Sequence, residues 1–187
     1  MWPTLVLKKV TIILINMELL KKKLIVYVVT LSGFMGFTQE ASCACCTENH
    51  KAFDFWVGTW LVTNPDGSQA GSSTIVKSER DCVVNENWTS AKAGYTGTST
   101  NFYNKITGQW EQLWIDNTGV HLKLKGNRQG NQMVLSSGEF QNKDGVLNRN
   151  RITWTLNDDG TVRQLWEIIQ GDKVVSTAFD GLYNKVE

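Results

Sequence analysis

The sequence predicts an all-β protein: a single up-and-down antiparallel barrel of about ten strands, preceded by a short N-terminal helical turn. Eight Trp and 16 Gly against only 2 Pro suit strands joined by tight turns. From residue 55 onward, short strand-like runs alternate with turn signals at regular intervals, as in a meander. No long helical periodicity follows residue 56, which argues against parallel α/β and helical-bundle folds. A flat ten-stranded sheet would leave two unpaired edges, so closure into a barrel is favoured.

Length and charge indicate one domain without a nucleic-acid partner. The chain has 187 residues, of which 41% are hydrophobic and 20% charged, enough for one well-buried core. From Cys43 onward, 14 Lys and Arg residues face 16 Asp and Glu residues, so the formal balance is 14 minus 16, or minus 2. Because the two signs are well mixed, no basic surface for nucleic acid is indicated.

The N-terminal region has the layout of a secretory signal peptide, predicted to span residues 1–38. A 14-residue apolar run at 24–37 follows Lys21, Lys22 and Lys23 and precedes small or polar residues. Met17 is an alternative start. A membrane anchor is the competing interpretation, but a spanning helix needs about 20 apolar residues. We therefore expect an exported protein, periplasmic or secreted, with no stable membrane span after processing.

A cysteine-containing segment, residues 39–52, comes next. In an exported protein, cysteines are most simply disulfide partners, and four cysteines allow three pairings that the sequence leaves open. The four candidates are Cys43, Cys45, Cys46 and Cys82. A Cu(I) or zinc site that includes His50 is a less favoured alternative, so no metal is expected. Lipid attachment at Cys43 is also disfavoured, because Glu40 stands where a bacterial lipoprotein signal would carry Leu.

The predicted helical turn covers residues 47–55. Thr47 is placed to cap it and Phe53 to pack back, so that the turn would plug one mouth of the barrel.

The barrel domain is predicted at 53–187, and its first strand carries the clearest motif. Gly58 and Trp60 supply a close backbone approach and a large aromatic ring, the pair needed to seal one end of a barrel. The run Phe-Asp-Phe-Trp-x-Gly-x-Trp that ends at Trp60 resembles the lipocalin and calycin group, and it looks like a bacterial lipocalin-like family of unknown function. This resemblance implies a calycin-type barrel and little about chemistry.

The remaining strands follow from alternation and turn residues. The predicted strands are 55–63, 70–78, 82–90, 95–104, 108–115, 118–126, 131–139, 146–156, 161–169 and 173–184. Their connections carry glycines suited to the positive φ of hairpin turns, namely Gly67, Gly108, Gly119, Gly145 and Gly160.

Period-two alternation gives several strands a face that mixes large aromatic and hydrogen-bonding side chains. If these faces point inward, the barrel holds a Trp-walled pocket with fixed polar groups, suited to a small amphipathic or polar molecule. The candidate ligand-binding residues are Glu86, Trp88, Ser99, Gln112, Trp114, Gln164 and Trp166. The competing interpretation is that these Trp rings only fill a core.

Glu86 is the most informative single residue, because an inward carboxylate must be paired, hydrogen-bonded or protonated. Three roles remain open: a structural contact with a Trp indole or with Arg149 or Arg151, ligand binding, or general acid–base catalysis with Tyr95 or Tyr103 as partner. The direction of the two arginines is undecided from the sequence.

The other chemical signals are weak. His121 alternates with lysines and is expected to face solvent. The heme-binding barrels that resemble this architecture extend the Gly-x-Trp motif with glycines and offer a late His, and neither feature occurs here. No cofactor is expected, and no common hydrolase, phosphate-loop or metalloprotease motif is present.

These signals favour a binding protein whose small-molecule ligand is not identified by the sequence. A small barrel enzyme, an isomerase or hydrolase using Glu86, is the alternative from another class, and a filled structural barrel is a third. A cavity that reaches Glu86 would separate the open barrel from the filled one.

Overall fold

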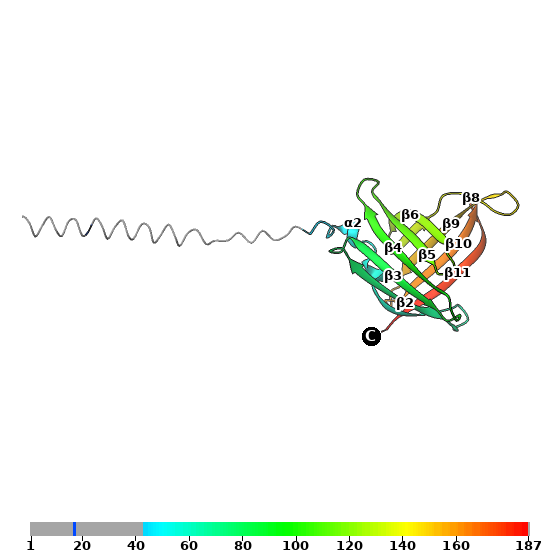
Figure 1. Ribbon diagram of the computed structural model, residues 1–187, viewed down its shortest axis with the longest axis horizontal. Helices are drawn as coiled ribbons and strands as arrows, with labels where there is room; N and C mark the ends of the chain where they lie inside the picture. Colours follow the sequence, from blue (N-terminus) through cyan, green and yellow to red (C-terminus); the bar gives the residue numbers. More distant parts are fainter. Residues whose placement is uncertain (1–16, 18–42, 187) are drawn as a thin grey trace, which may run out of the picture. The chain divides into compact units, whose positions relative to one another are not determined.

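A closed antiparallel β-barrel forms the body of the protein in a computed structural model, which describes Met17 and residues 43–186. The predicted signal peptide therefore lies outside the described residues, apart from Met17. The strands wrap around one hydrophobic core, with a short helical segment at one end (Figure 1). The all-β, up-and-down barrel predicted from the sequence is confirmed, and its architecture is lipocalin-like.

The elements follow the chain as a meander. Two short helical pieces, α2 (Glu48–Lys51) and the 3₁₀ helix η1 (Asp54–Trp56), precede the strands. The strands are β1 (Gly58–Thr63), β2 (Gln69–Ser78), β3 (Val83–Ser90), β4 (Thr96–Asn104), β5 (Gln109–Asp116), β6 (His121–Gln129), β7 (Gln132–Ser136), β8 (Phe140–Gln141), β9 (Leu147–Leu156), β10 (Val162–Gln170) and β11 (Lys173–Lys185).

Sequential antiparallel pairing and one closing contact make the barrel. The spatial order is β10-β11-β1-β2-β3-β4-β5-β6-β7-β9, and β10 also pairs with β9, so the ring of ten strands is complete. The two-residue strand β8 pairs only with β9, outside this ring. Closure leaves no long unpaired edge among these ten strands.

Two predicted boundaries are wrong in an informative way. The strand predicted at 55–63 begins only at Gly58, because Phe53 and Trp56 both turn into the core from the 3₁₀ turn η1. That spacing of three is helical and differs from the period of two on which strand prediction depends. The strand predicted at 131–139 ends at Ser136, and β8 lies in a connection where no strand was predicted.

The turn chemistry is as predicted. All five glycines predicted for the hairpin connections have positive φ, between 66° and 86°. An L side chain rarely adopts this conformation, so these positions fix where each hairpin turns.

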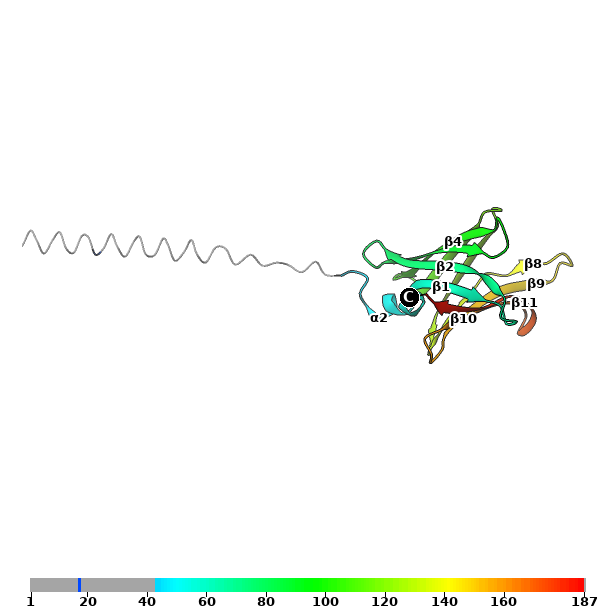
Figure 2. The same cartoon turned by 90° about the horizontal axis from the view of Figure 1, so that it is seen from below.

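The N-terminal helical segment plugs one end of the barrel, as predicted. Phe53 and Trp56 are fully buried and stack with ring centroids 4.9 Å apart. The Phe53 ring also meets Trp110 and Trp154 edge-on, at 5.6 and 5.2 Å. Thr47 occupies the N-cap position of α2, but its hydroxyl bonds the His50 Nδ1 and caps no backbone N–H. In Figure 1 and Figure 2 this segment lies at the same end of the barrel as the C-terminal end of β11.

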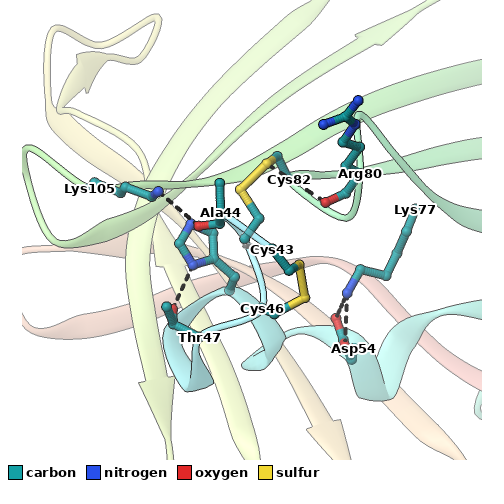
Figure 3. The surroundings of a disulfide bond; sticks show 11 residues. Cys43, Ala44, Cys46, Thr47, Asp54, Lys77, Arg80, Cys82 and Lys105 are labelled. Carbon is teal, nitrogen blue, oxygen red and sulfur yellow. Dashed lines mark hydrogen bonds and ion pairs between the residues drawn. A yellow bond between two sulfur atoms is a disulfide. The ribbon is translucent and has the colours of Figure 1, made fainter. Parts of the chain in front are cut away.

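Polar contacts and one of the two disulfides fasten this plug to the barrel (Figure 3). Cys45 is joined to Cys82, just before β3, and Cys43 is joined to Cys46 within the segment. All four predicted cysteines are therefore used. The Lys77 Nζ of β2 contacts both carboxylate oxygens of Asp54, at 2.9 and 3.0 Å. Further bonds from the barrel to the segment come from Lys105 Nζ to the Ala44 carbonyl, Trp110 Nε1 to the Asn49 carbonyl and Arg128 to the Ala52 carbonyl.

Gly58 and Trp60 occupy the structural positions predicted for them. Trp60 is 1% exposed, and its indole N–H donates to the Trp56 carbonyl at 2.9 Å. Gly58 has φ +149°, and a Cβ there would meet the Lys185 side chain at 3.0 Å and the Trp60 ring at 3.5 Å. The Lys185 Nζ lies 5.6 Å from the Trp60 ring centroid, so the ring is covered by a cation.

Among the described residues, no helix has both the length and the apolar character needed to cross a membrane.

Candidate functional site

A cavity of about 440 Å³ lies inside the barrel, at the end opposite the plug. It reaches the surface beside Gln69, Ala91 and Lys92, which are exposed and lie in or next to the β1–β2 and β3–β4 connections. The volume is within the range of small-molecule sites, roughly 300–1,000 Å³. A completely filled barrel is therefore inconsistent with this structure.

The structure brings six of the seven predicted site residues to the wall of this cavity. These are Glu86 and Trp88 from β3, Gln112 and Trp114 from β5, and Gln164 and Trp166 from β10. The period-two alternation therefore correctly predicted which face of β3, β5 and β10 points into the barrel. The seventh, Ser99 of β4, is fully buried and is not among the lining residues. Their role in binding stays a prediction.

Glycines on neighbouring strands let the aromatic wall lie close to the backbone. A Cβ on Gly97 would collide with the Trp114 ring, and a Cβ on Gly71 would collide with the Trp88 ring. A Cβ on Gly181 would likewise collide with the Phe179 ring. That ring meets Trp88 edge-on, with centroids 5.9 Å apart. The missing side chains give these rings room to lie against the wall, which leaves the centre of the barrel open.

Glu86 reaches the cavity and is only 4% exposed. The Ser73 hydroxyl donates to its Oε1 at 2.9 Å, and the Ser99 hydroxyl donates to its Oε2 at 3.0 Å. Tyr183 of β11 contacts it as well. Burial raises the pKa of Glu86 to about 7, against the opposing effect of the three hydroxyls. No Lys or Arg of the described chain bonds this carboxyl group, so a structural Glu–Arg pair is excluded here.

Tyr183 is a cavity residue that the sequence prediction missed. It is 1% exposed, lines the cavity and contacts Glu86, and burial raises its pKa well above the ordinary value. Of the two tyrosines proposed as partners, Tyr95 also lines the cavity, but its hydroxyl donates to Asp116 at 3.1 Å, and Tyr103 accepts from Asn49 at the plug. Neither hydroxyl bonds Glu86. The signal that could have found Tyr183 is its alternation with Phe179 on the last predicted strand.

The undecided arginines do not reach the cavity. Arg151 pairs with Glu167 at 2.9 Å, on the face of β9 opposite the inward Ile152. Arg149 shares that face, and neither residue lines the cavity.

A hydrogen-bond network connects Glu86 to the two glutamines of the cavity. On one side, Asn101 donates to Ser99 at 3.0 Å and accepts from Gln112 Nε2 at 2.7 Å. On the other side, the Tyr183 hydroxyl bonds Gln164 Oε1. Polar groups with fixed directions therefore face an aromatic wall, an arrangement that can orient a bound molecule.

The remaining candidates for chemistry lie outside the cavity. His121 is exposed, as predicted. His50 is buried at the plug, where it bonds Thr47 and meets Tyr103 edge-on, and burial lowers its pKa. Cys43, Cys46 and Asp81 are close enough to surround an ion, but the two sulfurs are bonded to each other and so offer no thiolate.

Comparison with known proteins adds nothing to this geometry. No protein-family model matches the chain, and no curated protein matches it in sequence. The function is therefore argued from the cavity and its residues.

Proposed function

We propose that this protein is an exported, lipocalin-like binding protein that holds a small amphipathic or polar molecule inside its barrel. The observation that carries the proposal is the cavity of about 440 Å³, with an aromatic wall and a buried polar network that includes Glu86. A barrel built only for stability would gain by filling this space, because apolar contacts across it are lost. Export is supported by the two disulfides, which persist mainly in oxidising compartments.

Binding is tested with a small-molecule library, read out by tryptophan fluorescence and by the melting temperature. Four Trp side chains line the cavity and should report directly on occupancy, namely Trp88, Trp114, Trp154 and Trp166. A ligand present at 100 times its dissociation constant should raise the free energy of unfolding by about 2.7 kcal/mol.

A matched pair of glycine variants locates the bound molecule. Gly97→Ala should push the Trp114 ring into the cavity and weaken binding about tenfold or more, since overpacking costs roughly 1–3 kcal/mol. Gly138→Ala is the control, because a Cβ there meets nothing within 4 Å and its φ is ordinary. Equal affinity in the two variants would place the ligand outside the cavity and contradict the proposal.

Catalysis is the second candidate function, and the contact between Glu86 and Tyr183 favours it. A carboxyl group whose pKa lies near 7 can both give and take a proton at neutral pH, which suits an isomerase or hydrolase. Glu86→Gln separates the two functions. An enzyme should lose turnover and keep its substrate affinity, whereas a binding protein should lose affinity for a polar ligand and have no turnover to lose.

A further inference from the structure

Glu86 is the only acidic side chain among the described residues that line the cavity. None of the three ion pairs in the described part of the chain includes it. The one basic residue on the wall, Lys92, is exposed at the opening. The cavity wall therefore carries a buried carboxyl group that no cation of residues 43–186 neutralises.

This carboxyl group has room for a further partner. The Ser73 and Ser99 hydroxyls donate to different oxygens of Glu86, at 2.9 and 3.0 Å, and Tyr183 lies beside it. An ionised carboxylate has about four lone-pair positions, more than these three hydroxyls can fill. Because the Glu86 side chain lines the cavity, a bound donor or cation can approach it from there.

The strand register brings two Trp residues to the same part of the wall. Ser99 of β4 pairs with Glu86 on one side and with Trp114 on the other. Trp88 follows Glu86 on the same face of β3 and lies opposite Gly97 of β4, where a Cβ would collide with the Trp114 ring. Neighbouring strands are about 4.8 Å apart, so the backbones of β3 and β5 are roughly 10 Å apart. The carboxyl group and the two indole rings thus surround one small volume.

A cation suits this combination better than an anion or a neutral group. Trp faces attract cations more strongly than the faces of Tyr or Phe, and an ion pair gains strength where water is excluded. An anion would be repelled by Glu86, and a neutral group would leave the ionised carboxylate without a counter-ion. Burial raises the pKa of Glu86 to about 7, which agrees with a carboxylate that lacks a counter-ion. The wall adds further rings that can cover an apolar group, namely Trp154, Trp166 and Phe179.

We infer that the cavity takes a small organic ammonium ion, whose positive group lies between Glu86 and the rings of Trp88 and Trp114. The apolar part of this ion lies against the remaining aromatic wall. This ligand class rests on the proposed binding function, and it adds to that function the charge of the ligand and the residue that recognises the charge.

Recognition by Glu86 makes the affinity depend on pH. With a pKa of about 7, roughly one tenth of Glu86 is ionised at pH 6 and roughly nine tenths at pH 8 in the unbound protein. The other titratable residues on the wall are Tyr95, Tyr183 and Lys92. Both tyrosines have raised pKa values and stay neutral in this range, and Lys92 is exposed at the opening. Asp116, which accepts from Tyr95, has a lowered pKa and stays ionised.

Isothermal titration calorimetry with three matched probes tests the assignment. The probes 3-phenylpropylammonium, 3-phenylpropan-1-ol and 3-phenylpropanoate share a ring and a chain and differ in the charge of the head group. At pH 8 we expect the ammonium ion to bind about tenfold more tightly than the alcohol, and the carboxylate to bind most weakly. Between pH 8 and pH 6 the affinity for the ammonium ion should fall about tenfold, while the affinity for the alcohol stays nearly constant.

Two variants assign the contacts. Glu86→Gln should bind the ammonium ion and the alcohol with similar affinity and lose the pH dependence. Glu139→Gln, at an exposed position outside the cavity, is the control and should keep both properties. Trp114→Leu should weaken the ammonium ion about threefold more than the alcohol, because Leu offers apolar contact without an aromatic face. Melting curves establish that each variant is folded, and the wild-type probe and pH series decides the ligand class without any variant.

The outcomes separate this inference from the function on which it rests. Tighter binding of the alcohol or the carboxylate than of the ammonium ion at pH 8 overturns the ligand class and leaves the binding function standing. A preference for the ammonium ion that persists at pH 6, or in folded Glu86→Gln, shows that Glu86 does not recognise the charge and overturns the assigned contact. Failure of all three probes overturns the ligand class too, and the library screen then decides the binding function independently.

Discussion

Glu86 is a buried carboxyl group that the protein satisfies with hydroxyl groups alone. Its oxygens accept from Ser73 and Ser99, and the Tyr183 hydroxyl of β11 lies close to it in the cavity. These three residues come from β2, β4 and β11, the elements packed against Glu86, and none of them carries a positive charge. The carboxyl group is therefore more stable protonated than ionised at the pH where an exposed Glu would have lost its proton.

The contribution of Glu86 to the stability of the protein should fall as the pH rises from about 4.5 to about 7, whereas His50, whose pKa is lowered by burial, acts in the opposite direction below pH 6.5. In this window the unfolded chain ionises Glu86 at its ordinary pKa of 4.5, while the folded protein keeps the proton until its pKa of about 7. The folded state binds more protons, so the free energy of unfolding should decrease by up to roughly 3 kcal/mol and then level off above pH 7. Urea unfolding at several pH values from 4 to 8 measures this change.

Glu86→Gln should remove most of that decrease, because the amide does not titrate. Glu139→Gln, at an exposed position, serves as the control and should keep it. The same pH dependence in the wild-type protein and in Glu86→Gln would show that another group is responsible.

At the scale of single residues, the sequence could predict which side chains point into the barrel, but not which groups they bond. Period-two alternation is a local property, and it was enough to turn Glu86, Gln112 and Gln164 toward the interior. Their hydrogen-bond partners depend on the register between strands that are distant in sequence. The β10–β11 pairing shifts register twice, after Trp166 and after Ile168. Counting residues from the hairpin turn therefore could not predict the position of Tyr183 along the barrel, or that it lies beside Glu86.

At the scale of elements, the N-terminal segment is a separate piece that the barrel holds by its two ends. Near its start, Cys45 is bonded to Cys82, and near its end, Phe53 and Trp56 are buried under the first strand. The sequence predicted a plug because the aromatic residues follow a helical cap. It could not predict the pairing of the cysteines, because the position of Cys82 relative to the plug is a tertiary property.

Removing the two disulfides should have unequal effects on stability. Cys45 and Cys82 are 37 residues apart, so their bond restricts a long loop of the unfolded chain, and Cys45→Ala/Cys82→Ala should lower the free energy of unfolding by about 3–4 kcal/mol. Cys43 and Cys46 are only 3 residues apart. Cys43→Ala/Cys46→Ala should therefore cost less, about 1–2 kcal/mol.

Guanidinium unfolding of the two double variants, each against the oxidised wild-type protein, makes this comparison. A larger loss from the short loop than from the long one would mean that local contacts of the segment, and not restriction of the unfolded chain, determine its stability.

At the scale of the whole molecule, oxidation and export are linked expectations. The protein has four cysteines, and both disulfides of the barrel unit use all of them. Mass spectrometry of protein recovered from the exported fraction should show that about the first 38 residues are missing, as signal peptides are removed on export. Thiol titration should find no free thiol before reduction and four afterwards. Full-length protein with four reactive thiols would contradict both expectations.

The plug also limits the routes by which a molecule could enter and leave the cavity. With one end filled by Phe53, Trp56 and their aromatic neighbours, a molecule in the cavity must leave by the opening through which it entered, near Lys92. If the proposed ligand binds in this cavity, we expect it to enter and leave at the same end of the barrel and not to pass through from one end to the other. Since we expect entry and release to share the opening near Lys92, a change at that opening should alter both rates together and leave the equilibrium affinity nearly constant.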